Sequence, residues 1–416
     1  MRYSMTPTIR LTAAGFIATA VAFGPARMGF GLFLPAFREE FAFSTSIAGM
    51  IASGGFSAFL LALLASAWIG RRYGARVAVV TGALSAAAGF AVVAVAGTAS
   101  LLALGIALAG ASAGFCWAPF NDAAERVVAD EARASALSVV STGTTFGITA
   151  AAGLALAVTA GMLDWRGAWA GFALSGLVLT GIAQAGLPSN RTAKPIYDAA
   201  IEILLAGLPA GAHQKPDRAA ASPSLAQRAA VPLYSTALCF GMTNAVFLSF
   251  AADRVVAAGG LPGLPDVAAS AVIFLGYGIC GVLGLATGRI EARIGLDPLL
   301  GAIFAAGALS LVLIALAPTA WIAVLVASGL HGAAIMMVSA VFSFWSLRLF
   351  PGRSTLGFTA TLLSLAAGSI LGPALAGWLA AAQGPKVMFL IAAVPSLATA
   401  LWFWARLRQS DRVQRL

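Results

Sequence analysis

The chain has 416 residues, of which 60% are hydrophobic and only 10% carry a charge, and its mean hydropathy is +0.93. A soluble domain has roughly 25% charged residues, so this composition excludes an ordinary soluble protein and predicts an integral membrane protein. The net charge of +10 would suit nucleic-acid binding only if the basic residues shared one exposed face, but they are scattered between apolar runs. We therefore expect the lipid bilayer, and no nucleic acid, as a partner.

Charged residues divide the chain into apolar runs, because a membrane-spanning helix needs about 20 residues nearly free of charge. Ten such runs are present. Two of them, 77–121 and 298–347, are about twice the length of one helix, and each has a break near its middle, at Gly97-Thr98 and at Pro318-Thr319. Splitting these two runs predicts an all-α integral membrane protein of twelve transmembrane helices.

The distribution of lysine and arginine predicts how the chain is oriented. With the N-terminus inside, 20 of the 25 basic residues fall in segments on the cytosolic side. Four fall on the opposite side: Arg38, Arg166, Arg254 and Lys386. Because basic loops stay in the cytosol, we expect a multi-pass protein of the cell membrane, in bacteria the inner membrane, with both termini cytosolic.

An internal repeat relates the two parts of the chain. The segment from Ala67 to Arg76 matches the segment from Gly288 to Asp297, which begins 221 residues later and keeps Ile, Arg and Gly in register. Gly147 and Gly368 are separated by the same 221 residues. A duplicated membrane unit explains both matches.

The segment from Ala67 to Arg76 resembles the loop between the second and third helices of the major facilitator superfamily, Gly-x-Leu-x-Asp-Arg-x-Gly-Arg-Lys. Ile69, Arg72, Gly74 and Arg76 fit this motif, and Arg293 and Gly295 repeat two of its positions in the second copy. Two positions depart from it, because Ala67 replaces the first glycine and Arg71 replaces the acid. In the second copy Ala292 takes the place of the acid, and Glu291 stands one residue early.

The resemblance implies two pseudo-symmetric six-helix halves that alternate access to a central cavity. We expect an N-terminal half at 1–187, a cytosolic connector at 188–228 and a C-terminal half at 229–416, acting as a monomer. The resemblance also implies that the first, fourth, seventh and tenth helices line the cavity. Each of them carries an unusual polar residue: Arg27, Asn121, Asn244 and His331.

Arg27 is the main candidate for binding a solute. It lies three residues after Gly24, where Gly24-Pro25 should break the first helix, and about 12–15 Å from the expected outer end of that helix. An ionisable group at this depth indicates function by default, although a structural role bonded to helix carbonyls or to another helix stays open. Phe30, Trp117 and Tyr277 are candidates for an aromatic wall, and they could equally be ordinary packing residues.

Two further groups admit a functional and a structural interpretation. His331 could couple transport to a proton, or it could be a hydrogen-bonded packing residue. Asp122, Glu125 and Arg126 end the fourth helix and could simply be solvated, or their carboxylates could pair with Arg71 and Arg72 as a latch of reversed polarity. Glycine pairs such as Gly143-x-x-x-Gly147 could serve helix packing alone, or form seams that slide during transport.

The sequence favours a secondary transporter of a small organic solute, and the anion preference rests on Arg27. An ion or solute gradient would drive it, because no nucleotide-binding motif, catalytic motif, metal-ligand spacing or cofactor fingerprint is visible. One alternative is a proton-coupled efflux antiporter for drugs or metabolites. Against it, Gly147 is followed by Ile148 where such exporters have proline in the fifth helix, and the first helix lacks their frequent acid. The other alternative is a receptor that has the transporter fold but moves nothing.

Overall fold

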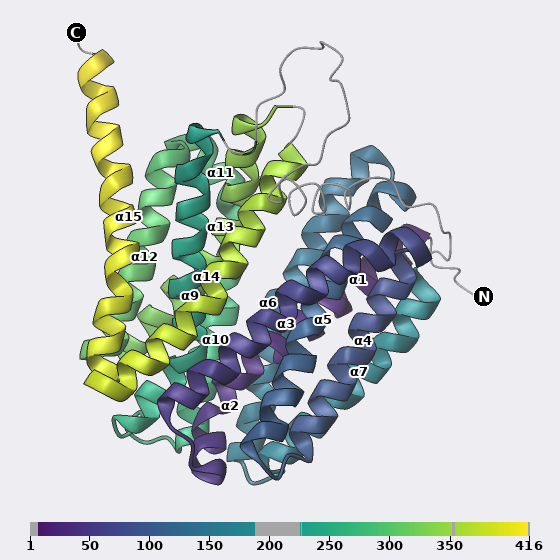
Figure 1. The fold of residues 1–416 in the computed structure, drawn as a ribbon, viewed down its shortest axis with the longest axis vertical. Coiled ribbons are helices and arrows are strands. Elements are labelled where there is room, and N and C mark those ends of the chain that lie inside the picture. The colour runs from purple at the N-terminus through teal and green to yellow at the C-terminus, as the bar shows by residue number, and fades with distance from the viewer. Residues whose placement is uncertain (1–6, 188–224, 226, 352–353, 415–416) are drawn as a thin grey trace, which may run out of the picture.

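The computed structural model describes residues 7–187, 225, 227–351 and 354–414. Twelve helices in these ranges are long and apolar enough to cross a membrane, as the sequence predicts. Helices are favoured because they satisfy every backbone hydrogen bond within the segment where no water is available. Figure 1 shows them as two bundles, with the first half in purple to blue and the second half in green to yellow.

The first half contains seven helices, two of which form its first span. They are α1 (Pro7–Phe23), α2 (Pro25–Phe41), α3 (Thr45–Tyr73), α4 (Ala75–Ala94), α5 (Ala99–Val127), α6 (Asp130–Thr159) and α7 (Trp165–Gly186). The second half contains η1 (Arg228–Ala230), α9 (Val231–Ala257), α10 (Asp266–Gly281), η2 (Val282–Ala286), α11 (Thr287–Ile294), α12 (Leu296–Leu316), α13 (Trp321–Leu349), α14 (Ser354–Gln383) and α15 (Pro385–Gln414). Most of the expected connector, 188–224, lies outside the described residues.

The first span is broken where Gly24-Pro25 predicts. Pro25 is the first residue of α2 and has no N–H to donate, so the helix can change direction at Gly24. Gly24 also packs on α6, because a Cβ there would lie 2.5 Å from the carbonyl carbon of Gly147. Pro25 therefore provides the bend, and Gly24 allows the close approach of the two helices.

Two helices extend further than the charged residues suggest. α2 continues past Pro35 to Phe41, which places Arg27 about 21 Å from its end, deeper than expected. α9 continues to Ala257 and takes Asp253 into the helix, although the sequence places the end of the apolar run at Ala252. Treating every charge as the end of a span is wrong at Asp253, because this carboxylate is only 6% exposed and pairs with Arg38.

The two copies of the loop motif have the same backbone geometry. Gly74 joins α3 to α4 at φ 91° and ψ 165°, and Gly295 joins α11 to α12 at φ 84° and ψ 172°. Only glycine adopts this left-handed region readily. The matching conformations at equivalent positions support the repeat that the sequence predicts.

The predicted glycine pairs pack helices within each half. A Cβ at Gly147 would lie 2.0 Å from the Ala20 carbonyl oxygen of α1, and one at Gly368 would lie 2.0 Å from the Leu238 carbonyl oxygen of α9. Such positions let backbones approach closely without side chains between them. Since these seams lie inside the halves, the described contacts favour the packing interpretation over sliding.

The halves contact one another mainly through the pairs α3–α14, α6–α10 and α2–α9. We call the end of the bundle where α1 begins and α15 ends the terminal face, and the opposite end the far face. Figure 1 shows the two sets of ribbons close together at the far face, at the bottom, and diverging toward the terminal face. α2, the part of the first span nearer the far face, contacts the second half, whereas the principal contacts of α1 are within its own half.

Candidate functional site

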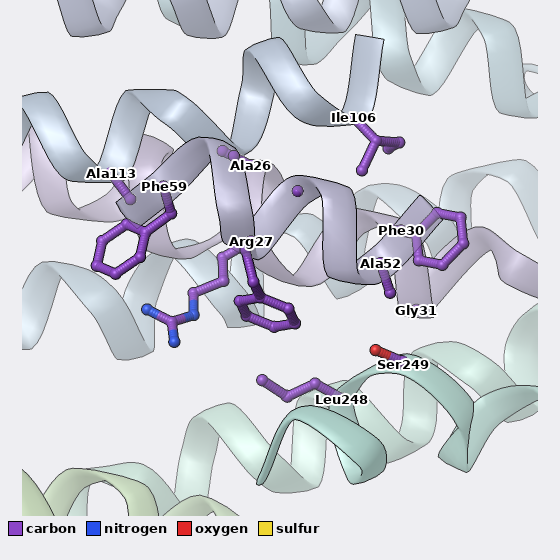
Figure 2. Close-up of a pocket in the computed structure, with 13 residues that line it drawn as sticks. Ala26, Arg27, Phe30, Gly31, Ala52, Phe59, Ile106, Ala113, Leu248 and Ser249 are labelled. Atoms are coloured by element: carbon purple, nitrogen blue, oxygen red, sulfur yellow. The ribbon is translucent and has the colours of Figure 1, made fainter. Parts of the chain in front are cut away.

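A small cavity lies between the halves, beside the broken first span. It is lined by four helices, through Ala26, Arg27, Phe30 and Gly31 of α2, Ala52, Gly55, Phe56 and Phe59 of α3, Ile106, Gly110 and Ala113 of α5, and Leu248 and Ser249 of α9. Figure 2 shows these side chains around the Arg27 side chain. The cavity volume is about 30 Å³, whereas pockets for organic ligands measure roughly 300–1,000 Å³. The halves must therefore move apart before an organic solute can occupy this place.

Arg27 supplies the charge of this cavity, and all other lining residues are uncharged. Its guanidinium carbon lies 5.8 Å from the ring centre of Phe23, 5.3 Å from that of Phe56 and 5.1 Å from that of Phe59. Each distance is within the range of a cation–π interaction, which contributes about 0.5–2 kcal/mol depending on solvation. We call these three rings the phenylalanine cage, and it offsets part of the cost of an arginine at this depth.

The N–H groups of Arg27 are not used within the described part of the protein. Arg27 makes no hydrogen bond or ion pair with a residue whose side chain the structure describes, and its side chain is only partly buried. In Figure 2 its guanidinium lies apart from the hydroxyl of Ser249, the other polar side chain of the lining. The rings stabilise the charge and leave the planar fork of N–H donors able to bind an anion.

Three other predicted residues form a separate buried group in the second half. The hydroxyl of Tyr277 donates to Asn244 Oδ1 at 3.3 Å, and the His331 ring stacks on Phe247 with centroids 4.1 Å apart and planes within 9°. Asn244, Tyr277 and His331 are each 1% exposed and do not line the cavity of Arg27. Tyr277 nevertheless lies on α10, which contacts the α2 helix of Arg27 across the interface between the halves.

Of the remaining predicted residues, Phe30 lines the cavity and stacks on Phe37 at 6.1 Å. The side chains of five predicted residues of α5, and that of Arg71 in α3, lie outside the described part of the structure. The five are Trp117, Asn121, Asp122, Glu125 and Arg126.

The cavity is closed toward the far face by contacts that the sequence analysis missed. A Cβ at Gly31 would lie only 1.7 Å from the carbonyl oxygen of Leu248, so α2 and α9 touch backbone to backbone beside the cavity. Nearer the far face, Arg38 donates to Asp253 at 2.7 Å. The available signal was an acid at the end of the seventh span and a base near the end of the first, but the charge-free run of the seventh span stops just before Asp253.

A family model described as Major Facilitator Superfamily matches residues 15–339. The chain belongs to the major facilitator superfamily. Among curated proteins, no sequence matches the chain significantly. The superfamily and its transporter structures identify the chain as a transporter of small solutes and not as an enzyme.

Solved structures of superfamily-type transporters share the fold at low sequence identity. A peptide transporter POT in complex with sulfate has a TM-score of 0.73 at 15% identity, covering 99% of this chain and 96% of that chain. The nucleoside transporter NupG has a TM-score of 0.71 at 14% identity, covering 96% and 99%. A bacterial homologue of the human lysosomal transporter Spinster, inward-facing and occupied, has a TM-score of 0.68 at 14% identity, covering 96% of each chain.

The superfamily loop motif lies at the terminal face and ties helices together in each half. Arg76, at the start of α4, donates to the Leu187 carbonyl at the end of α7, at 2.7 Å. Asp297, the equivalent position 221 residues later, pairs with Arg406 of α15 at 3.6 Å. The two halves thus make the same connection, between their third and sixth spans, with opposite charges.

The loop arginines next to these positions have fewer contacts. Arg72 stacks on Tyr73, with its guanidinium carbon 5.6 Å from the ring centre, and remains exposed. Arg293 is exposed as well. In the second half Glu291, which stands one residue before the position of the motif acid, pairs with Arg348 at the end of α13. In the second half, the loop motif is therefore connected to the end of α13, and the loop supplies the acid of this ion pair.

Proposed function

We propose that this transporter carries a small organic anion, such as a carboxylate, by alternating access between its two halves. The observation that carries the proposal is Arg27, held by the phenylalanine cage at a cavity between the halves, with its N–H donors unused by described residues. Arginine binds carboxylates through two parallel hydrogen bonds, which are among the stronger hydrogen bonds in proteins. A solute carboxylate would thus complete the site.

The apolar lining suits the rest of such a solute. Apart from Arg27 and Ser249, the cavity is lined by alanine, glycine, aliphatic and phenylalanine side chains. A short hydrocarbon body would bury its surface here once the halves separate, while the carboxylate remains on Arg27. A cationic drug would instead have to pass the positive charge of Arg27, so no described contact of this site favours multidrug efflux.

In the proposed alternating-access cycle, we assign this structure to a state in which the two halves meet at the far face. The described contacts between the halves include Gly31 with Leu248 and Arg38 with Asp253, which lie on the far side of Arg27. With both termini cytosolic, as the basic loops suggest, this is a state closed to the outside. Labelling of a cysteine at Ser222 from outside intact cells would contradict that orientation.

The transport proposal is tested by counterflow into liposomes that contain the purified protein. Short carboxylates and hydrophobic cations are each supplied as labelled solute against an excess of the same unlabelled solute. We expect exchange of at least one carboxylate and none of the cations. Exchange of cations alone, or of no solute in the panel, would overturn the proposal, and the second result would favour the receptor alternative.

A further inference from the structure

Hydrogen-bond directions fix the tautomer of the buried His331. The hydroxyl of Ser310 donates to the Ala327 carbonyl at 2.9 Å, and a hydroxyl has one hydrogen to give. The contact of 3.2 Å between His331 Nδ1 and Ser310 Oγ must therefore run the other way, from a protonated Nδ1 to the oxygen. A neutral ring follows, because protonating Nε2 as well would leave a buried charged donor unpaired. The Nε2 of His331 thus carries a lone pair.

This lone pair has no hydrogen-bond partner within the described part of the protein. Nε2 is fully buried and unsatisfied. Ring stacking on Phe247, with centroids 4.1 Å apart, fixes the plane of the imidazole. A buried acceptor without a partner is rare in folded proteins and calls for an explanation, such as a ligand or a water molecule.

His331 lies among the helices of the second half that meet the first half. Its Nδ1 faces Ser310 on α12, and the face of its ring stacks on Phe247 of α9. The helices packed on α13 include α9 and α10, and both of them contact the first half. α9 also lines the cavity of Arg27, so the unsatisfied Nε2 belongs to the group of helices beside that cavity.

The groups near His331 determine which chemical group of a ligand could bind to Nε2. The Tyr277 ring lies 6.2 Å from the His331 ring, and its hydroxyl hydrogen is used by Asn244, which leaves the oxygen as an acceptor. The described side chains of this group are neutral, and Arg27, on the helix α2 that packs against α10, interacts electrostatically with Tyr277. Two acceptors without an acid, close to a cation, suit a neutral hydroxyl and disfavour an ammonium group.

We infer that His331 Nε2, beside Tyr277, forms a second subsite that accepts a hydrogen bond from a hydroxyl group of the solute. The inference rests on the proposed function, since Arg27 would hold the carboxylate of the same molecule. The solute is then a hydroxy carboxylate, bound by Arg27 of the first half and by His331 of the second. Binding across the interface would draw the halves together around it.

The test compares butyrate with 2-, 3- and 4-hydroxybutyrate as labelled solutes in counterflow. For the unmodified protein we expect at least one hydroxy isomer to exchange about tenfold more efficiently than butyrate, because a buried acceptor penalises the analogue that lacks the donor. His331→Asn keeps a donor near the position of Nδ1 and loses Nε2, so it should lower that ratio to about one. His331→Gln keeps an acceptor near the position of Nε2 and should retain most of the preference.

Each outcome has a distinct meaning. Both His331 variants should elute from a sizing column as the unmodified protein does and unfold at a similar temperature, which shows that the variants fold. If carboxylates exchange and need Arg27, but all four solutes exchange equally or His331→Asn keeps the preference, the second subsite is wrong and the proposed function stands. If no carboxylate of the series exchanges with the unmodified protein, the second subsite is overturned, and the proposed function is overturned with it when the wider panel of carboxylates also fails to exchange.

Discussion

Arg38 of α2 and Asp253 of α9 form an ion pair 2.7 Å long that joins the two halves between the cavity and the far face. The side chain of Asp253 is 8% exposed and that of Arg38 is 30% exposed. Among the acids whose side chains the structure describes, Asp253 is the one that is fully buried. Separating the halves here would leave it without its cation, so this pair should stabilise the state closed at the far face.

Replacing Asp253 by Asn should weaken this closure. Losing one partner of a mostly buried pair costs about 3–5 kcal/mol, and the partial exposure of Arg38 reduces this to about a third. A cysteine at Ser249, in a chain without the native cysteines, should then react about tenfold faster with a reagent supplied at the far face. Asp266→Asn, an exposed acid at the start of α10, is the matched control and should have no effect. An unchanged rate in Asp253→Asn would show that the pair does not hold the halves together.

Gly31→Ala should open the same face by a steric route. Its Cβ would lie 1.7 Å from the Leu248 carbonyl oxygen, so the backbones of α2 and α9 would have to separate. Gly54→Ala is the control, because nothing lies within 4 Å of a Cβ at that position in α3. We expect faster labelling of the Ser249 cysteine from the far face in Gly31→Ala alone. Equal labelling in both variants would contradict a tight contact at Gly31.

Gly147→Ala should lower the stability of the first half. The added methyl group would lie 2.0 Å from the Ala20 carbonyl oxygen and force α1 and α6 apart, at a cost of about 1–3 kcal/mol. Gly153→Ala lies on the exposed side of the same helix, with nothing within 4 Å, and should gain up to about 1 kcal/mol of helix propensity. Thermal unfolding of the purified variants compares them directly. A stability of Gly147→Ala at or above that of Gly153→Ala would rule out the packing role.

The first-half latch, in which Arg71 or Arg72 pairs with Asp122 or Glu125, remains a prediction that double mutants can test. Glu291 and Arg348 of the second half serve as a positive control, since they form a described pair in which the acid is 14% exposed. Such pairs contribute up to about 1 kcal/mol, so single reversals of charge should shift the balance between conformations by up to about fivefold. Exchanging the two charges should restore part of the balance. Purely additive effects in the first half, with rescue in the second, would leave the latch without support.

The sequence predicted the features that local chemistry determines. The apolar runs define the twelve spans, Gly24-Pro25 defines the break, and the repeated motif marks Gly74 and Gly295 as equivalent positions, which have similar backbone conformations. Each follows from a few neighbouring residues. Arg27 was recognisable in the same way, because a lone charge inside an apolar run is conspicuous.

The sequence could not show which distant residues meet. Phe56 and Phe59 are two of many phenylalanines in apolar runs, and only the packing of α3 against α2 brings them to Arg27. Asp253 lies just beyond the charge-free run of the seventh span, and its ion-pair partner Arg38 is 215 positions away in the chain. His331 was visible as a polar residue in its span, but its tautomer depends on Ser310 of another helix.

Counterflow with Arg27 variants tests the central claim most directly. Arg27→Lys keeps the charge and loses the planar fork, whereas Arg27→Ala loses both, so we expect the first to lose most carboxylate exchange and the second nearly all of it. Arg166→Lys, at a partly exposed position in α7 outside the cavity of Arg27, is the control and should exchange normally. All three proteins should insert at the level of the unmodified protein. Exchange at the unmodified rate in both Arg27 variants, or vigorous exchange of bulky cations by the unmodified protein, would contradict an anion site at Arg27.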